Sequence, residues 1–179
     1  AAHKGGVMEK CQELYDQLKA QGLRVKLDDR DTLSPGFKFN DWELKGVPLR
    51  IEIGPRDLEK GQCIVFRRDT YEKQEVALQE LSHKLPLLLD DIQKNMFAIA
   101  REFRDGRIKV VSNMEELKKA TENGFAKAMW CGERACEDRI KAEMSVTSRN
   151  MPFDQQPVGD HCVCCGEKAD KVIYFAKAY

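Results

Sequence analysis

The chain has 179 residues, 42% of them hydrophobic, and its 30 lysines and arginines balance 30 aspartates and glutamates, so its formal net charge is zero. That length suits one large domain or two small ones. A neutral chain argues against nucleic-acid binding by bulk positive charge, and favours selective contacts if RNA is a partner. No apolar run approaches the roughly 18 residues of a membrane helix. Residues 1–4 lack both an initiator Met and the apolar core of a signal peptide. We therefore expect a cytoplasmic protein, with no membrane partner, whose sequence starts inside a longer chain.

The first hundred residues predict a domain in which helices alternate with strands. Apolar residues recur at helical spacing from Val7 to Leu18, and Gly22 follows where a helix C-cap is expected. Residues 23–27, 49–53 and 62–67 alternate between apolar and polar, as half-buried strands do. A short helix is predicted over 37–45, a turn over 54–57 and a long helix over 76–104, in which Pro86 implies a kink or a start.

The remaining residues predict a second, smaller domain. After the turn Asp105-Gly106, residues 108–111 predict a strand, and residues 114–123 predict a helix opened by Asn113. The apolar residues 172–175 predict another strand. We therefore expect an α/β fold: a domain over 1–103 with a mixed sheet flanked by helices, followed by a small α+β domain over 104–179.

Seven cysteines are present, and five of them lie within residues 131–165. Four residues separate Cys131 from Cys136, and two separate Cys162 from Cys165. Two thiolate pairs at such spacings suit one tetrahedral zinc ion, and a glycine follows one member of each pair, where the backbone can fold around sulfur. Four protein ligands leave no open position for water, so the predicted zinc is structural.

Other interpretations of the cysteines remain open. Cys164 or His161 could replace a ligand of the second pair. A redox C-x-x-C motif would also use paired cysteines, and so would disulfides, although a chain without a secretion signal disfavours them. Cys11 and Cys63 lie on apolar periodic segments, and we expect both in the core.

One tract, from Pro35 to Asp57 (PGFKFNDWELKGVPLRIEIGPRD), joins aromatic, acidic and basic side chains. This tract, and the later Arg67-Arg68-Asp69-Thr70 with Lys73, closely resemble the anticodon-binding domain of class II prolyl-tRNA synthetases of the eukaryote-like and archaeal type. The spacing of the four cysteines and the ending Ala176-Lys177-Ala178-Tyr179 resemble the zinc-binding C-terminal domain of the same type. The resemblance covers nearly the whole chain.

The resemblance implies that the chain recognises the anticodon of proline tRNA, within an enzyme that uses ATP to ligate proline to that tRNA. Nothing in the chain resembles the class II catalytic core. ATP and Mg²⁺ would therefore bind to a catalytic domain outside this chain, which holds no catalytic residue and should be inactive alone. The resemblance also implies that the full-length enzyme is a homodimer and that Tyr179 packs toward the catalytic domain, whereas a frayed terminus is the alternative.

Proline anticodons carry two adjacent guanines. A carboxylate can accept hydrogen bonds from the ring N–H and amino group of guanine, an arginine can donate to its O6 and N7, and unstacked bases in single-stranded RNA stack on aromatic rings. The resemblance gives the stacking role to Phe39 and the hydrogen bonds to guanine to Glu43, Arg50 and Asp57. Arg67 and Arg68 are weaker candidates for phosphate contacts.

Each of these residues also has a structural interpretation. Glu43 could lie on a solvated helix face. Arg50 and Glu52 point the same way on an alternating strand and could form a salt bridge within the sheet. Asp57 could cap a turn. Phe39 could be a core residue.

Other residues of the same region could take part. Phe37 or Trp42 could stack on a base in place of Phe39. The acidic run Asp28, Asp29 and Asp31 could hold a divalent ion, although we expect a solvated loop.

Two other functions are compatible with these residues. One is a freestanding adaptor that binds RNA or protein and contains a structural zinc knuckle. The other is a thiol redox protein. Class II catalytic motifs upstream in the native gene would exclude the adaptor, and one tightly held zinc ion per chain would exclude the redox protein.

Overall fold

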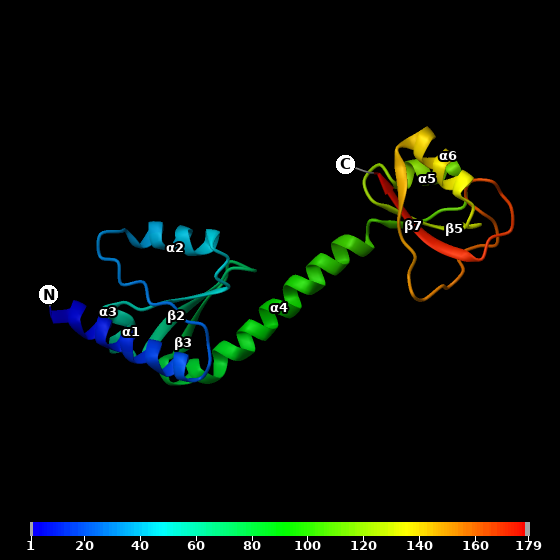
Figure 1. The fold of residues 1–179 in the computed structure, drawn as a ribbon. Helices are drawn as coiled ribbons and strands as arrows, with labels where there is room; N and C mark the ends of the chain where they lie inside the picture. Colours follow the sequence, from blue (N-terminus) through cyan, green and yellow to red (C-terminus); the bar gives the residue numbers. More distant parts are fainter. Residues whose placement is uncertain (1, 178–179) are drawn as a thin grey trace. The chain divides into compact units, whose positions relative to one another are not determined.

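Helix α4 (Leu81–Asp105) carries the boundary between two compact units of the chain. The computed structural model describes residues 2–177, with unit 1 ending at Ala98 and unit 2 beginning at Ile99 (Figure 1). The boundary predicted after residue 103 falls within the same helix. Each unit has a hydrophobic core of its own. Within the described residues, no helix is long and apolar enough to cross a membrane.

Unit 1 combines a three-stranded sheet with helices. In chain order its elements are α1 (Ala2–Ala20), α2 (Pro35–Leu44), β1 (Leu49–Glu52), α3 (Pro55–Glu59), β2 (Gln62–Arg67), β3 (Lys73–Ala77), the 3₁₀ turn η1 (Leu78–Glu80) and the first part of α4. The strand order is β1-β2-β3, and both pairs are antiparallel.

The two faces of this sheet have different partners. Cys63 and Val65 of β2 point to one face, where they form a buried cluster with Leu14 of α1 and Leu81 of α4. Because side chains alternate along a strand, Phe66 points to the opposite face, which is the side of α2 (Figure 1). One face of the sheet therefore builds the core, and the other face lies toward α2.

Three predictions for unit 1 were wrong. Residues 23–27 form no strand, although Leu23 and Val25 do pack against the core, as their alternation indicated. Residues 73–77 pair with β2 as strand β3, so α4 begins at Leu81 and not near residue 76, and Pro86 lies inside it. The predicted turn at 54–57 contains the start of the short helix α3, with Pro55 at its first position.

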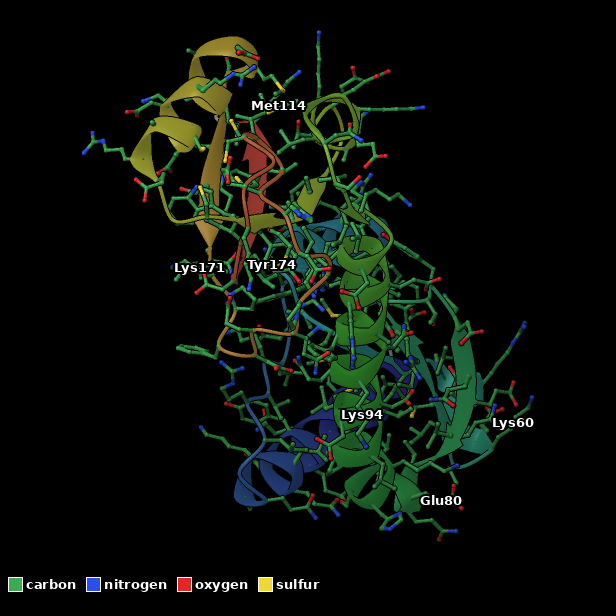
Figure 2. The ribbon with its side chains drawn as sticks, turned by 90° about the vertical axis from the view of Figure 1, so that its right-hand side faces the viewer. Lys60, Glu80, Lys94, Met114, Lys171 and Tyr174 are labelled. Atoms are coloured by element: carbon green, nitrogen blue, oxygen red, sulfur yellow. The ribbon has the colours of Figure 1, made fainter. Side chains whose placement is uncertain are left out.

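Unit 2 is built on a mixed four-stranded sheet. Its elements after α4 are β4 (Ile108–Val110), α5 (Met114–Ala120), β5 (Phe125–Trp130), α6 (Arg134–Met144), β6 (Val146–Asn150) and β7 (Lys171–Lys177). The strand order is β4-β5-β7-β6, with β4 and β5 parallel and the other pairs antiparallel. Lys171, at the start of β7, and Tyr174, at its middle, are labelled in Figure 2.

The core of unit 2 lies between this sheet and its two helices. Leu117 of α5 and Ile140 of α6 are fully buried against Phe175 of β7. Asn113 caps α5 as predicted, because its side chain accepts a hydrogen bond from the Glu116 N–H at 2.9 Å. The predicted α/β class, with a mixed sheet flanked by helices, is confirmed. The mixed pairing lies in unit 2, whereas the sheet of unit 1 is antiparallel.

Candidate functional site

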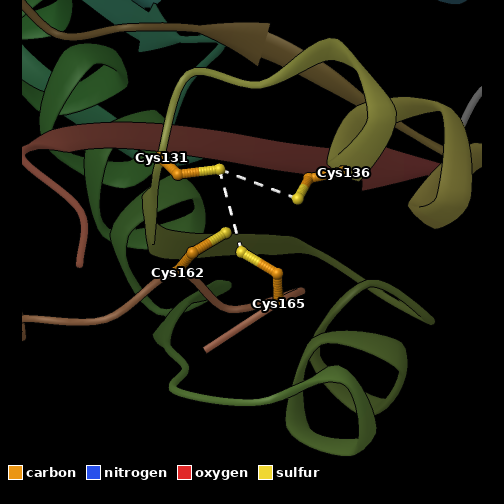
Figure 3. A group of neighbouring side chains, drawn as sticks. All are labelled: Cys131, Cys136, Cys162 and Cys165. Carbon is orange, nitrogen blue, oxygen red and sulfur yellow. Dashed lines mark hydrogen bonds between the residues drawn. The ribbon is translucent and has the colours of Figure 1, made fainter. Parts of the chain in front are cut away.

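Four cysteine side chains from separate segments of unit 2 converge on one point (Figure 3). Cys131 follows β5, Cys136 lies in the first turn of α6, and Cys162 and Cys165 lie between β6 and β7. Their sulfur atoms all lie within 4.8 Å of one another. The Sγ atoms of Cys131 and Cys136 are 3.6 Å apart, and those of Cys131 and Cys165 are 3.9 Å apart. Zinc–sulfur bonds of about 2.3 Å in a tetrahedron require sulfur separations of about 3.8 Å. The group therefore fits a tetrahedral metal ion.

The local backbone brings these sulfur atoms together. Gly132 and Gly166 have φ angles of 92° and 77°, in the left-handed region that glycine enters without strain. The Gly166 N–H donates to the Cys162 carbonyl oxygen at 2.9 Å, and the Cys162 N–H donates to the Glu167 carbonyl oxygen at 2.7 Å. These bonds close a tight loop around the second cysteine pair.

The same loop favours a thiolate at Cys162. Burial raises the pKa of the Cys136 and Cys131 thiols. Burial also acts on Cys162, but backbone N–H groups, first that of Cys165, donate to its sulfur and lower the pKa to about 7. The thiolate is the form that binds metal ions. The side chain of Lys171 packs against Gly132 and adds positive charge beside Cys131.

The two alternative ligands, Cys164 and His161, lie outside this sulfur group. Cys164 packs beside the two buried clusters of unit 2, and His161 is exposed. Cys63 is fully buried, as predicted, and burial raises its pKa to about 11. The prediction that Cys11 is a core residue was wrong, because it is only half-buried. Within residues 2–177, no other group of histidine, cysteine or acidic side chains could hold a metal ion.

In unit 1, Arg50 of β1 is the centre of a second group of polar side chains. Its Nη1 donates to Glu43 Oε1 at 2.8 Å, and its Nε donates to Glu52 Oε1 at 3.0 Å. Lys73 Nζ donates to the second carboxylate oxygen of Glu52 at 3.1 Å. The predicted salt bridge between Arg50 and Glu52 is therefore present, and it extends to Glu43.

Two aromatic rings contact the same guanidinium group. The Cζ atom of Arg50 lies 3.9 Å from the ring centroid of Phe39 and 4.0 Å from that of Phe66. Phe66 stands directly opposite Arg50 in the β1–β2 ladder, which explains the contact. Only 14% of the Arg50 side chain is exposed. Phe66 could not be predicted from the sequence, because only the strand register shows which residue lies opposite Arg50.

Helix α2 brings Phe39 and Glu43 to Arg50. These two residues are four positions apart and so lie on one face of the helix. The helix begins at Pro35, and the Ser34 side chain caps it by accepting from the Phe37 N–H at 3.4 Å. Three of the predicted site residues, Phe39, Glu43 and Arg50, are thus brought into one group.

The neighbouring aromatic residues of α2 have different surroundings. Trp42 donates from Nε1 to Asp28 Oδ2 at 2.8 Å, and Lys45 Nζ lies 4.5 Å from the centroid of its ring. Phe37 is exposed. Hydrogen bonds from Arg30, and then from Trp42, lower the pKa of Asp28 well below its ordinary value. Asp28 therefore belongs to an ion pair.

Asp57 caps helix α3. Its Oδ2 accepts a hydrogen bond from the Gly54 N–H at 2.9 Å, which is the capping role that the sequence offered as an alternative. Within residues 2–177, no hydrogen bond to Oδ1 of this carboxylate is formed. Asp57 therefore keeps one oxygen for another donor.

Arg67, the last residue of β2, and Arg68, which follows it, differ in their ion pairs and hydrogen bonds. Arg67 donates to both carboxylate oxygens of Asp69, at 3.1 and 2.8 Å, and also to Asp91 at 2.6 Å. Arg68, in contrast, forms no ion pair within the described part of the chain, and its buried Nε has no hydrogen-bond partner there.

Two protein families match the chain, one mainly in unit 1 and the other in unit 2. Residues 2–87 match the family described as "Anticodon binding domain". Residues 114–179 match the family described as "Prolyl-tRNA synthetase, C-terminal". The first match contains the Arg50 group, and the second contains the four cysteines.

Curated relatives resemble the chain along its whole length. It is 51% identical to a proline–tRNA ligase of Alkaliphilus oremlandii and 49% identical to proline–tRNA ligase 2 of Clostridioides difficile, with 100% of this chain and 38% of each relative covered. A proline–tRNA ligase of Clostridium botulinum is 51% identical over 100% of this chain and 37% of its own length. The chain thus spans less than two fifths of the length of these relatives, and it corresponds to a C-terminal part of them.

Proposed function

We propose that this chain, which carries the anticodon-binding domain and the C-terminal domain of prolyl-tRNA synthetases, recognises the anticodon of proline tRNA within a proline–tRNA ligase. The main support is the Glu43–Arg50 pair with Phe39, because it combines an acceptor, a donor and an aromatic ring in one place. These are the three means by which proteins recognise single-stranded bases.

Glu43 is the guanine acceptor in this proposal. Its Oε1 is oriented by Arg50, whereas Oε2 accepts no hydrogen bond within residues 2–177. The side chain is 30% exposed, so a base can reach it. Each carboxylate oxygen has two lone pairs, so Glu43 can accept from the ring N–H and the amino group of guanine while it stays paired with Arg50.

Arg50 orients this acceptor and can also donate to the RNA. Hydrogen bonds to Glu43 and Glu52 use two of its five N–H groups, and its Nη2 lies 2.9 Å from Glu52 Oε1. The N–H groups that make no hydrogen bond to these carboxylates are available for O6 or N7 of guanine. Contact with Phe39 and Phe66 stabilises the guanidinium group and limits its movement.

Asp57 and Arg68 complete the proposed RNA contacts. The free Oδ1 of Asp57 is an acceptor for the second guanine, while its Oδ2 keeps the cap of α3. Arg68 is the phosphate contact, because no carboxylate neutralises it in the described residues. Arg67 was proposed for the same role, but its bonds to Asp69 and Asp91 favour a structural one.

Zinc is the metal that the four cysteines suit best. Four thiolates complete its tetrahedral coordination and leave no position for a catalytic water. When bound, the ion would hold Cys131, Cys136, Cys162 and Cys165 together and stabilise the fold of unit 2. A redox role is disfavoured, because a pair of cysteines would suffice for it and four are brought together.

The ligase activity itself is proposed for the longer protein. ATP and Mg²⁺ would bind to its catalytic domain, and proline would be joined to tRNA there.

We also propose a cytoplasmic homodimer of the eukaryote-like and archaeal type, although the relatives named above are bacterial. The proposed packing of Tyr179 against the catalytic domain concerns a residue outside those that the structure describes. A freestanding adaptor is disfavoured, because proline–tRNA ligases match the chain over its full length.

The test is tRNA binding by the full-length protein that contains this chain. Glu43→Gln keeps the size of the side chain but removes the anionic acceptor. Wild-type protein should prefer proline tRNA over transcripts in which inosine, which lacks the amino group, replaces either guanine, by about 1–3 kcal/mol. Glu43→Gln should lose this preference at one position, whereas Glu59→Gln, an exposed position on α3, should retain it. Equal binding of guanine and inosine transcripts by wild type would contradict the proposed function.

A further inference from the structure

Tyr71 occupies the turn between β2 and β3 in an unusual backbone conformation. Its φ angle is 60°, in the left-handed region where a bulky residue is uncommon and strained. The residue is 71% exposed, so burial of its side chain does not compensate for this strain. A strained backbone that presents an aromatic ring to solvent is typical of a binding position.

The ring of Tyr71 continues the aromatic contacts around Arg50. Its centroid lies 6.1 Å from that of Phe66, with the two ring planes 65° apart. This is the edge-to-face geometry that aromatic pairs prefer. Phe66 in turn contacts the Arg50 guanidinium group at 4.0 Å. Tyr71 is therefore connected through Phe66 to Arg50, one of the proposed guanine contacts.

The turn that holds Tyr71 is fixed to helix α4. Asp69, with 2% of its side chain exposed, accepts hydrogen bonds from Arg67 and, at 2.7 Å, from Asn95 of α4. The Arg67 N–H also donates to the Glu72 carbonyl oxygen at 2.9 Å across the turn. An aromatic ring on such an anchored turn loses little conformational freedom when a ligand binds.

We propose that Tyr71 stacks on a nucleobase next to the guanine pair and thereby extends the anticodon site. The same turn carries Arg68, whose buried Nε has no partner in the described residues. An exposed ring beside an unpaired cation matches single-stranded RNA, which offers a flat base and a phosphate at each nucleotide. This inference rests on the proposed anticodon recognition and adds a contact outside the two guanines.

The test measures binding of proline-tRNA anticodon stem-loops to the full-length protein. Tyr71→Gly and Tyr71→Asn remove the ring with residues that tolerate positive φ, and Tyr71→Phe keeps the ring. Each protein is titrated with an unmodified stem-loop and with stem-loops that have one abasic nucleotide on either side of the guanines.

Tyr71→Gly and Tyr71→Asn should weaken binding of the unmodified stem-loop about tenfold, because a stacked base contributes on that scale. One abasic stem-loop should bind wild type and both variants alike. Tyr71→Phe should bind as wild type does, and the salt dependence of binding should not change, since no phosphate contact is lost. Both ring-deleted variants should melt no earlier than wild type.

Unchanged binding by both ring-deleted variants would overturn the inference, and so would equal losses for every abasic stem-loop. Loss of proline activation with unchanged RNA binding would also overturn it and would indicate contact with another part of the protein. Retention of the Glu43-dependent guanine preference in the same samples would show that the proposed function stands although the Tyr71 contact fails.

Discussion

Arg67 and Asp69 form a two-bonded ion pair in which the carboxylate is almost fully buried, with 2% of its side chain exposed. Asn95 and Asp91 of α4 bind the same pair at 2.7 and 2.6 Å. An arginine held in this way is part of the fold of unit 1. Arg68, its immediate neighbour, forms no ion pair in the described residues.

The two arginines should therefore respond differently to substitution. Arg67→Ala should lower the free energy of unfolding by about 1–3 kcal/mol, because it leaves the buried Asp69 carboxylate without its donor. Arg68→Ala should leave stability nearly unchanged, but should weaken binding to all tRNAs alike and reduce the slope of log affinity against log salt by about one. Denaturant titrations and binding curves at several salt concentrations measure both effects. The reverse pattern would contradict these roles.

The stability of unit 1 should depend on pH through Asp69. Hydrogen bonds from Arg67 lower the pKa of this carboxyl from 3.8 to about 2 in the folded state. A lowered folded-state pKa means that the stabilisation is complete above about pH 4 and is lost as the pH falls toward 2. The difference in unfolding free energy between wild type and Asp69→Asn should thus be constant above pH 4 and shrink below it. The pKa of Asp28 is lowered as well, but Asp28 is present in both proteins, so its contribution drops out of the difference. A constant difference down to pH 2 would show that the carboxyl is not perturbed.

Gly124 should not tolerate a side chain. A Cβ atom at this position would lie 2.2 Å from the backbone oxygen of Arg107, which also accepts a hydrogen bond from the Phe125 N–H at 2.9 Å. Gly124→Ala should lower the free energy of unfolding of unit 2 by about 1–3 kcal/mol, since the backbone at Arg107 or Gly124 must move. Gly159→Ala is the matched control, because its Cβ would meet only Met129 Cγ at an ordinary 3.7 Å. Equal melting temperatures for the two variants would contradict the predicted clash.

Removal of the metal should unfold unit 2 before unit 1. Cys165→Ser and a strong chelator should each abolish the bound zinc and expose the β5–β7 pairing to hydrogen exchange, because a structural zinc contributes folding energy directly. The β1–β2–β3 sheet should stay protected, since its core is separate. Cys164→Ala should retain one zinc ion per chain, because Cys164 lies outside the sulfur group. Metal analysis that finds no zinc in wild type would contradict the assignment.

The sequence was sufficient for features that depend on local chemistry. Helical spacing at 7–18, the Asn113 cap and the convergence of the four cysteines were predicted correctly, whereas metal binding by these cysteines stays a prediction. Each of these features depends on residues close in the chain or on a known ligand spacing. Alternation at 23–27 correctly indicated that Leu23 and Val25 are buried, but not that the segment lacks strand pairing. Alternation reports which side chains face the core, whereas a strand also needs a partner for its backbone.

Long-range pairing explains what the sequence did not show. Strand β3 was not predicted, and its last two residues fell within the predicted helix 76–104, since its exposed residues Lys73, Gln74 and Glu75 carry no apolar alternation. The contact of Phe66 with Arg50 depends on the β1–β2 register. The difference between Arg67 and Arg68 depends on Asp69 and also on Asp91, 24 positions further along the chain from Arg67. Side chains that act through such distant contacts can be identified only when the fold is known.

Strand β7 lies between β5 and β6 although it follows both in the chain. During synthesis, β5, α6, β6 and all four cysteines leave the ribosome before the strand that joins the two halves of the sheet. A zinc ion bound at that stage would hold these segments close together before β7 has been synthesised. Translation that stops short of β7 would leave two strand edges unpaired, so such products should be removed by proteases or aggregate and not accumulate as a partly folded domain.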